Sequence, residues 1–433
     1  MQNKVNLFLD NRNSFKSIVL YVVSAILVYL LMVCACQFQG FPKPPAIAQF
    51  DAGWYKVINL FGYDYTEGKG GTTGFFPLFP YVWRWLSLGD WGIVIFNALV
   101  YFIAIAWLTT LFGIQNKAIL IFLALPSALF YYLPFTESLF FLFSVMFLAG
   151  FENKSYLMVF TGLFLASLTK STTLFFIPAI AGMELCFAPK FNWLSAVKTI
   201  FWFCLPVVLG IAVVIFIQYE ATGTWFAFVK AQRNGWGHTF KWPVLPFTTA
   251  DQGRLIWLDG LAFIVGIFAA GTAGILFFRK LTRKAFTHYS RPYLFSVFIL
   301  TAMAFYGVFF QVQTVFGTEL VSMNRYVFCV PFFILFFYFT LKHIQLNRRF
   351  FLVTLAVLIA CFCLLGMFHS TQLFKAAGAA GNVLYFSCVA IAFYGAILSF
   401  KLQNTFIFLV FFILSLVTQV LLLSWFAMGK WVG

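Results

Sequence analysis

The stretch "FKSIVLYVVSAILVYLLMVCAC", residues 15–36, is an almost unbroken apolar run. A helix needs roughly 17 to 25 apolar residues to cross a bilayer, and this run is long enough. The whole chain repeats the pattern, because 63% of its 433 residues are hydrophobic and only 9% are charged. A soluble globular domain carries about 25% charged residues. The composition therefore excludes a water-soluble globular protein and predicts an all-α, multi-pass membrane protein.

The same length criterion predicts further spans along the chain. The region 117–188 is apolar throughout but is interrupted at "LPFTES" and "LTKS", so we divide it into four short or tilted segments. Together with the other spans this gives about thirteen transmembrane helices. The remaining expected spans lie at residues 15–36, 91–113, 200–219, 257–278, 292–311, 325–342, 350–369, 381–400 and 404–427.

The charged residues orient the chain in the membrane. The net charge of +16 does not indicate a nucleic-acid partner, because the basic residues lie mostly in short connections between apolar runs. Such residues favour the cytoplasmic side. With a cytoplasmic N-terminus and thirteen spans, the main basic clusters fall on that side: Lys4, Arg12 and Lys16; Arg279, Lys280, Arg283 and Lys284; and Lys342, Arg348 and Arg349.

The acidic residues then fall on or near the opposite, outer face. The two longest connections, residues 37–90 and 220–256, lie there as well, so we expect the chemistry in the outer loops of a single membrane domain spanning residues 1–433. The acidic residues concerned are Asp51, Asp64, Glu67, Asp90, Glu137, Glu220, Asp251, Asp259 and Glu319.

The first outer loop contains "IAQFDAGWYKVINLFGYDY", residues 47–65. Residues 51–62 predict an amphipathic helix in the plane of the interface, with an aromatic and aliphatic face formed by Trp54, Tyr55, Ile58 and Phe61. Asp51 lies at its start, either as a helix cap or as an active-site carboxylate. The glycine-rich "GKGGTTG" that follows lacks the spacing of a phosphate loop and predicts a flexible hinge.

Five segments in order resemble the PIG-V type mannosyltransferases, a family of GT-C-type membrane glycosyltransferases that has bacterial homologues. The first is Asp51 followed by "GY" and "FFPLFP", which is similar to the family's first luminal loop. The resemblance covers roughly residues 45–335, with Lys170 where the family usually has arginine and Asn324 where proline is commoner. The other four segments are "ALPSALFYYLPFTESLFFLFS" (124–144), "GLFLASLTKSTTLFFIPA" (162–179), "ATGTWFAFVKAQRNGWGHTFKWP" (221–243) and "SMNRYV" (322–327).

The resemblance implies a GT-C-like fold with a catalytic first extracytoplasmic loop. It also implies an inverting transfer of mannose from a polyprenyl-phosphate-mannose donor to a hydroxyl of a lipid-linked or glycan acceptor. Such a single displacement needs one carboxylate to take the proton of the acceptor, and Asp51 is the candidate. The phosphate leaves without being protonated, so a second, acid carboxylate is not required.

The leaving phosphate develops negative charge and needs cations. Lys170 lies at the end of an apolar run, where we expect it to bind the donor phosphate; the alternative is a lysine whose ammonium snorkels to the interface. Arg233 and Arg325 are further candidates for the phosphate site. Arg325 has a second interpretation, as an orientation anchor beside Tyr326.

Other polar and aromatic residues suit a sugar. Glu137 is a candidate for hydrogen bonds to sugar hydroxyls, for holding Lys170, or for capping the following helix. The second loop supplies candidate sugar or acceptor contacts, although its tryptophans also suit an interfacial anchor. A metal site at His238 is not expected, because His288 and His343 lie on the cytoplasmic side. No cofactor is required by the sequence, and a divalent cation on the outer carboxylates is left open, although these carboxylates show no ligand spacing. The candidate contacts of this loop are Gln232, Trp236, His238 and Trp242.

A transporter or flippase of a lipid-linked or small polar substrate is the alternative function. That class places ionisable or helix-breaking residues near the midplane of several spans, whereas here they lie at span ends. The expected partners are the polyprenyl-phosphate sugar, a glycolipid or glycan acceptor and membrane lipids. We expect a bacterial inner membrane, with the endoplasmic reticulum membrane as the alternative, and an extracytoplasmic active site.

Overall fold

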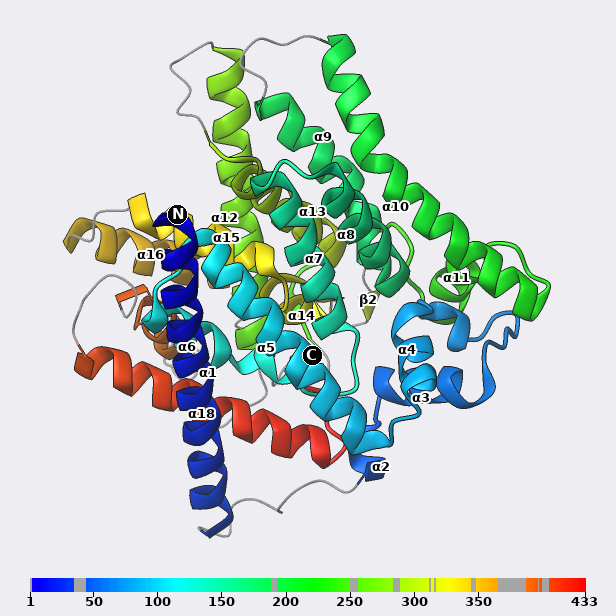
Figure 1. Cartoon of the computed structure of the whole chain (residues 1–433), viewed down its shortest axis with the longest axis horizontal. Coiled ribbons are helices and arrows are strands. Elements are labelled where there is room, and N and C mark those ends of the chain that lie inside the picture. The colour runs from blue at the N-terminus through cyan, green and yellow to red at the C-terminus, as the bar shows by residue number, and fades with distance from the viewer. Residues whose placement is uncertain are drawn as a thin grey trace.

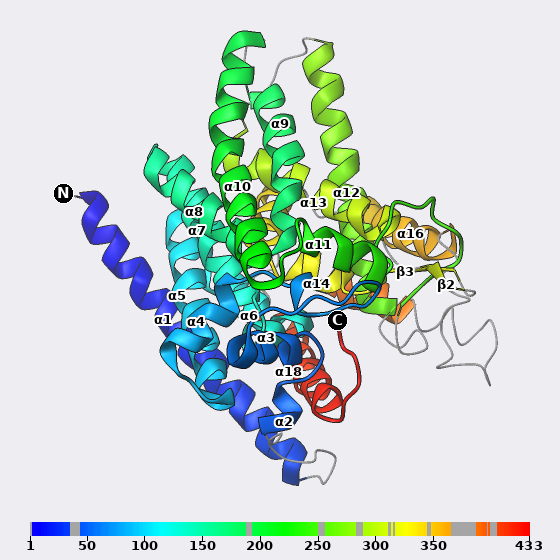
Figure 2. The same cartoon turned by 90° about the vertical axis from the view of Figure 1, so that its right-hand side faces the viewer.

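The structure is a computed structural model that describes residues 2–34, 44–187, 193–249, 256–282, 289–310, 313–314, 317–343, 348–364, 387–395, 397–398 and 405–433. The described chain is almost entirely helical (Figures 1 and 2). Its α-helices are α1 (Gln2–Cys34), α2 (Pro44–Ile47), α3 (Asp51–Phe61), α4 (Leu78–Leu86), α5 (Asp90–Phe112), α6 (Asn116–Leu123), α7 (Glu137–Glu152), α8 (Tyr156–Thr169), α9 (Phe176–Phe187), α10 (Trp193–Thr222), α11 (Ala227–Lys230), α12 (Ile256–Leu281), α13 (Arg291–Phe309), α14 (Met323–Phe328), α15 (Pro331–His343), α16 (Arg348–Leu364) and α18 (Thr405–Ala427).

Four short helical turns and three short strands complete the described elements. The strands form one sheet in the order β1–β3–β2, with β1 parallel and β2 antiparallel to β3. The turns are η1 (Thr72–Gly74), η2 (Pro126–Tyr131), η3 (Ser171–Phe175) and the π-type η4 (Ala231–Gly235), and the strands are β1 (Phe247–Thr248), β2 (Gln313–Thr314) and β3 (Gly317–Glu319).

Six helices of the described chain are long and apolar enough to cross a membrane. They are α1, α5, α10, α12, α13 and α18, and each coincides with an expected span. The protein is therefore a membrane-embedded, all-α protein. The interrupted region 117–188 holds four helices, α6 to α9, as its breaks predict. The expected span 381–400 lies partly outside the described residues.

The expected span 325–342 is divided in the structure. Helix α14 ends at Phe328 and α15 begins at Pro331, because proline has no amide hydrogen to continue the helical bonding of the preceding turn. The break places Arg325 in its own short helix, apart from the apolar helix that follows.

Small residues let the central helices approach closely. Gly162 of α8 faces the backbone of α7 at Phe143 and Phe147, and Gly210 of α10 faces Ser167 of α8. At both places a Cβ on the glycine would collide with its neighbour. Close approach through small residues is the usual device for packing helices in lipid, where the hydrophobic effect does not drive association. It fixes α8 between α7 and α10, side by side in Figure 2.

The two long loops pack on each other at the end of this bundle (Figure 2). The first of these loops contains α3 and α4, and the second contains α11. Gln232 Nε2 donates to the carbonyl of Gly74 over 3.0 Å, and Gly235 lies directly against the backbone of Gly70. The segment "GKGGTTG" therefore packs against the second loop, and glycine allows the close approach at Gly70 and Gly74; flexibility of this segment stays a prediction. Helix α3 forms as predicted, but its buried face holds Tyr55 and Ile58, whereas Phe61 is 82% exposed.

Candidate active site

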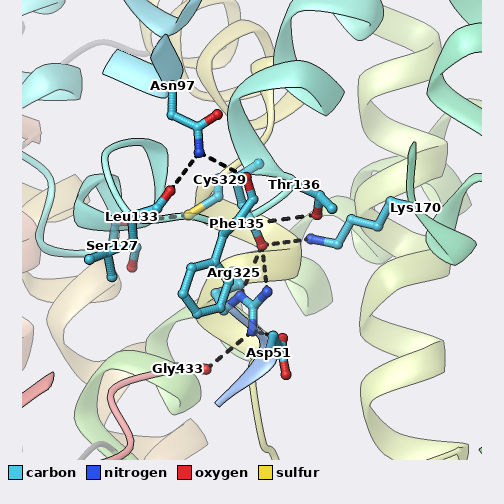
Figure 3. A network of polar contacts seen from close by, with 11 residues as sticks. Asp51, Asn97, Ser127, Leu133, Phe135, Thr136, Lys170, Arg325, Cys329 and Gly433 are labelled. Atoms are coloured by element: carbon cyan, nitrogen blue, oxygen red, sulfur yellow. Dashed lines mark hydrogen bonds and ion pairs between the residues drawn. The ribbon is translucent and has the colours of Figure 1, made fainter. Parts of the chain in front are cut away.

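Four charged side chains from distant parts of the sequence meet in one cluster (Figure 3). Arg325 donates from Nη1 to Asp51 Oδ2 over 2.7 Å, and from Nε and Nη2 to Glu137 Oε1 over 2.9 and 2.8 Å. Lys170 Nζ donates to the same Glu137 oxygen over 3.0 Å. We call these four residues the ion cluster. Its formal charges sum to zero.

Helix termini explain where three of the four charges lie. Asp51 is the first residue of α3 and Glu137 the first residue of α7, and the positive end of a helix dipole stabilises a carboxylate there. Lys170 immediately follows α8, where the negative end stabilises a cation. Neither helix start uses its carboxylate as a cap, because the capping positions are Phe50 and Thr136 and neither side chain makes a capping bond. The interpretations of Asp51 and Glu137 as caps are therefore wrong.

The cluster is buried to different depths. The exposed side-chain fractions are 0% for Glu137, 4% for Arg325, 11% for Lys170 and 26% for Asp51. Burying charged groups costs solvation free energy. The ion cluster is therefore weak evidence for stabilisation of the fold and better evidence for a functional site. Asp51 is the most exposed member and is thus the carboxylate that a substrate can reach.

Aromatic rings surround the guanidinium. The Arg325 Cζ atom lies 5.0 Å from the ring centre of Phe130, 4.7 Å from that of Phe135 and 5.9 Å from that of Trp431. Lys170 Nζ likewise lies 5.3 Å from the ring centre of Tyr326. Cations are attracted to such rings, and the rings exclude water from the ion pairs.

Strained backbone flanks the cluster on two elements. Phe50, just before α3, has φ 54°, and Ser322, just before α14, has φ 62°. Residues other than glycine rarely adopt positive φ, and such strain gathers at functional sites. Both residues line the cavity described below, and they set the directions in which Asp51 and Arg325 leave the backbone.

A third carboxylate, outside the ion cluster, supports the start of α14. Asp259 is buried at the start of α12; its Oδ1 accepts hydrogen bonds from the backbone and side-chain amides of Asn324, each over 2.9 Å. Its Oδ2 accepts from Thr249 over 2.6 Å. Because Asn324 precedes Arg325, these bonds hold the arginine in place. A proline at this position could make neither bond, because it has no backbone amide hydrogen and no side-chain amide.

The ion cluster opens into a cavity of about 520 Å³ between the two long outer loops and α14. Six of the nine site residues predicted from the sequence line it. Asp51, Lys170 and Arg325 contribute the charged groups, and the amide and ring side chains come from the second loop. The lining includes Asp51, Trp54, Lys170, Ser171, Thr172, Gln232, Trp236, His238, Tyr306, Glu319, Ser322, Arg325 and Trp431.

The second loop contributes a neutral histidine and a tryptophan to the wall. His238 Nδ1 lies 3.2 Å from the hydroxyl of Tyr306, and burial lowers the pKa of His238 below its usual value. Trp236 packs edge-on to Trp54 with ring centres 6.1 Å apart. This part of the cavity therefore offers aromatic surface and neutral hydrogen-bonding groups, a combination that suits a sugar ring.

Three predicted site residues lie elsewhere. Glu137 is fully buried beneath the cavity, where it holds Lys170 and Arg325; this is one of the roles expected for it, and it leaves no surface for a sugar. Trp242 is 75% exposed and packs on Phe309, so it lies outside the cavity and fits the interfacial-anchor alternative. Arg233 does not line this cavity but the one beside it.

The neighbouring cavity is about 550 Å³ in volume and mostly apolar. Leu174, Phe175, Phe228, Phe240 and Phe310 form much of its wall, and Arg233 is its one cationic lining residue. We call it the apolar cavity and the first one the polar cavity. The two share a wall formed by Ser171, Thr172, Gln232, His238 and Tyr306.

Sequence reasoning missed several residues of the polar cavity. Glu319 was only one of nine acidic residues assigned to the outer face, because a strand of three residues gives no pattern to mark it. Trp431 follows α18, in a part of the chain where no motif is evident, yet it lines the cavity and contacts Phe50 with ring centres 4.9 Å apart. Tyr55 also lines the cavity, and burial raises the pKa of its hydroxyl well above the usual value.

No protein-family model matches the chain, and neither the curated proteins nor the solved structures include a significant match. Within the part of the chain that the structure describes, no three or more His, Cys, Asp or Glu side chains group as metal ligands.

Proposed function

We propose that the chain is an inverting glycosyltransferase that moves mannose from a polyprenyl-phosphate-mannose donor to a hydroxyl of a lipid-linked or glycan acceptor at the extracytoplasmic face. One observation carries the proposal: a polar cavity with a carboxylate and two cations at its base shares a wall with an apolar cavity. The combination suits a donor with a sugar, a phosphate and a hydrocarbon chain. Mannose as the sugar comes from the resemblance of the motifs.

The proposed donor would occupy both cavities and pass along the residues that line both of them. Its hydrocarbon chain would lie in the apolar cavity and its sugar in the polar cavity, so that its phosphate falls near Lys170, Ser171 and Thr172. Hydroxyl groups and a cation are suitable partners for a phosphate diester. Arg233 lies in the apolar cavity, where it would meet the phosphate only during entry of the lipid.

In the transfer step the acceptor oxygen bonds to the anomeric carbon of the sugar as the bond from that carbon to the phosphate oxygen breaks. Asp51 takes the proton of the acceptor hydroxyl, and the leaving group departs as a polyprenyl phosphate. The leaving phosphate gains negative charge in the transition state, and Lys170 and Arg325 stabilise it there. Glu137 fixes Arg325 through Nε and Nη2, which leaves only Nη1 to face Asp51 and the cavity.

Asp51→Asn tests the proposal. The purified full chain in lipid is supplied with radiolabelled polyprenyl-phosphate-mannose and a total lipid extract as acceptor. We expect the wild type to label a glycolipid and the variant to lose at least about a hundredfold in rate, as expected for loss of a general base. The control is Asp64→Asn, which removes an exposed carboxylate of the same loop and should transfer normally.

Two results would contradict the proposal. Wild-type protein that transfers no sugar, or that only moves the labelled lipid between the two faces of a vesicle, would favour the flippase alternative. Equal rates in Asp51→Asn and wild type would leave the reaction standing but remove Asp51 from it.

A further inference from the structure

Glu319 occupies a rigidly held position at the edge of the polar cavity. It ends β3, the central strand of the sheet, and lies in register with Thr248 of β1. The next residue, Leu320, donates its backbone amide to the carbonyl of Thr248 over 2.7 Å. Ser322 then turns the chain into α14. The side chain of Glu319 is thus set by a sheet that joins the second outer loop to the helix bearing Arg325.

Glu319 differs from Asp51 although both carboxylates line the same cavity. Asp51 is tied to Arg325, whereas Glu319 makes no ion pair with any residue that the structure describes. Because the ion cluster is neutral, Glu319 is a negative charge that this cluster does not balance. Its half-burial raises its pKa above the usual glutamate value.

The two cavities assign Glu319 to one side of the reaction. The shared wall, where the proposed phosphate lies, does not include it. An inverting displacement requires the acceptor oxygen to attack the face opposite the leaving phosphate. Because Asp51 takes the proton of the acceptor hydroxyl, the acceptor must lie on the Asp51 side of the sugar. The part of the polar cavity outside the shared wall carries Asp51 together with Trp54, Glu319, Ser322 and Trp431, besides Lys170 and Arg325, which face the proposed phosphate.

We propose that Glu319 binds the acceptor, its carboxylate accepting a hydrogen bond from a hydroxyl next to the one that attacks. The inference rests on the proposed function and adds the class of acceptor: a sugar or other polyol with neighbouring hydroxyls, rather than a simple alcohol. Asp51 takes the proton of the attacking hydroxyl, and Glu319 holds the second hydroxyl without exchanging a proton.

The test separates acceptor binding from donor binding. Glu319→Gln is assayed in the transfer reaction, once with graded lipid extract at saturating donor and once with graded polyprenyl-phosphate-mannose at saturating extract. Hydrogen bonds to charged groups are worth enough to expect about a ten- to hundredfold rise in the half-saturating extract concentration. The donor KM should stay within about twofold of the wild-type value. Glu220→Gln, an exposed carboxylate on the same predicted face, is the matched control and should change neither.

The pH dependence gives a second readout. Protonation removes the charged acceptor of the hydrogen bond, so wild-type affinity for the extract should weaken as the pH falls through the raised pKa of Glu319. In Glu319→Gln this step should be absent. If the glutamine variant does not fold, Glu319→Asp retains the charge on a shorter side chain and should keep the step with weakened acceptor affinity.

The outcomes distinguish the two proposals. A wild type without transfer overturns the proposed function, and this inference with it. A wild type that transfers, with a Glu319→Gln variant whose dependence on extract is unchanged, overturns the role of Glu319 alone. A variant that raises only the donor KM places Glu319 on the donor side and also overturns the inference.

Discussion

Two arginines of this protein, one buried and one partly exposed, are paired in different ways. Arg291, at the start of α13, makes a closed pair with Glu184 of α9 through Nε and Nη2 at 2.7 and 3.2 Å. Its Cζ atom lies 4.1 Å from the ring centre of Phe187. Arg325 is instead shared between two carboxylates, and one oxygen of Glu137 accepts bonds from both Arg325 and Lys170.

The difference separates a structural tie from a reactive cluster. In the Arg291 pair each oxygen of the Glu184 carboxylate has its own donor, so another arrangement of the two side chains would add no hydrogen bond between them. In the ion cluster Glu137 Oε1 accepts three hydrogen bonds, whereas Oε2, among the residues that the structure describes, meets only Thr136 over 3.4 Å. Arg325 Nη1 holds the partly exposed carboxylate of Asp51, and a substrate group can take its place. We therefore expect substitutions at the two arginines to affect different properties.

Arg325→Lys should have the largest effect on transfer. Lysine cannot reproduce the planar fork that reaches both carboxylates, so one of them loses its partner. We expect the transfer rate to fall by about a hundred- to a thousandfold, as when a donor to transition-state charge is removed. Rate measurements in lipid check this, with Arg279→Lys at the exposed end of α12 as the control. A rate near that of the wild type would make Arg325 a structural anchor like Arg291.

Lys170→Ala should have a smaller and more selective effect. The ammonium lies on the wall of the polar cavity and touches the proposed phosphate position, so its loss should raise the donor KM by about ten- to a hundredfold. The protein should remain folded, because Arg325 still compensates Glu137. Lys230→Ala, an exposed lysine of α11, is the matched control. Unchanged donor kinetics would return Lys170 to the snorkelling interpretation.

Arg291→Gln should have the smallest effect on transfer and a clear effect on stability. It leaves the buried Glu184 without its partner. Because Arg291 is partly exposed, we expect a cost of about 1–3 kcal/mol, between the values for an exposed and a fully buried pair. Thermal unfolding in detergent should show the loss, and Glu184→Gln in the same chain should recover part of it. The transfer rate per folded molecule should stay within about twofold of the wild-type rate. A rate that falls as far as in Arg325→Lys would remove the distinction between the two arginines.

Much of the fold could be predicted, because span length and charge distribution follow directly from the bilayer. The six long helices and the four segments of 117–188 are of this kind. The break between α14 and α15 was not predicted, because the apolar stretch 325–342 is long enough for one span and its hydropathy does not reveal the break before Pro331. At the site, Asp51, Lys170 and Arg325 could be predicted from the sequence, because each is an isolated charge beside an apolar run. The structure brings all three into the ion cluster.

The remaining site residues depend on tertiary structure that no local pattern encodes. Trp236 and Trp242 stand six residues apart in the same loop, yet the first lines the cavity and the second faces away from it. Glu319 is placed by a sheet built from two loops far apart in sequence. Trp431 reaches the cavity from the segment that follows α18, in a part of the chain far in sequence from the other lining residues.

The close helix contacts at Gly162 of α8 and Gly210 of α10 have a consequence for genetics. Lys170 follows directly on a helix whose depth is set by Gly162 and by its contact with Gly210. A methyl group added at either glycine would displace that helix and carry the ammonium away from the shared wall. Alleles that abolish activity should therefore turn up in the lipid-embedded middle of the bundle, and a survey of inactive mutants confined to the outer loops would overlook them.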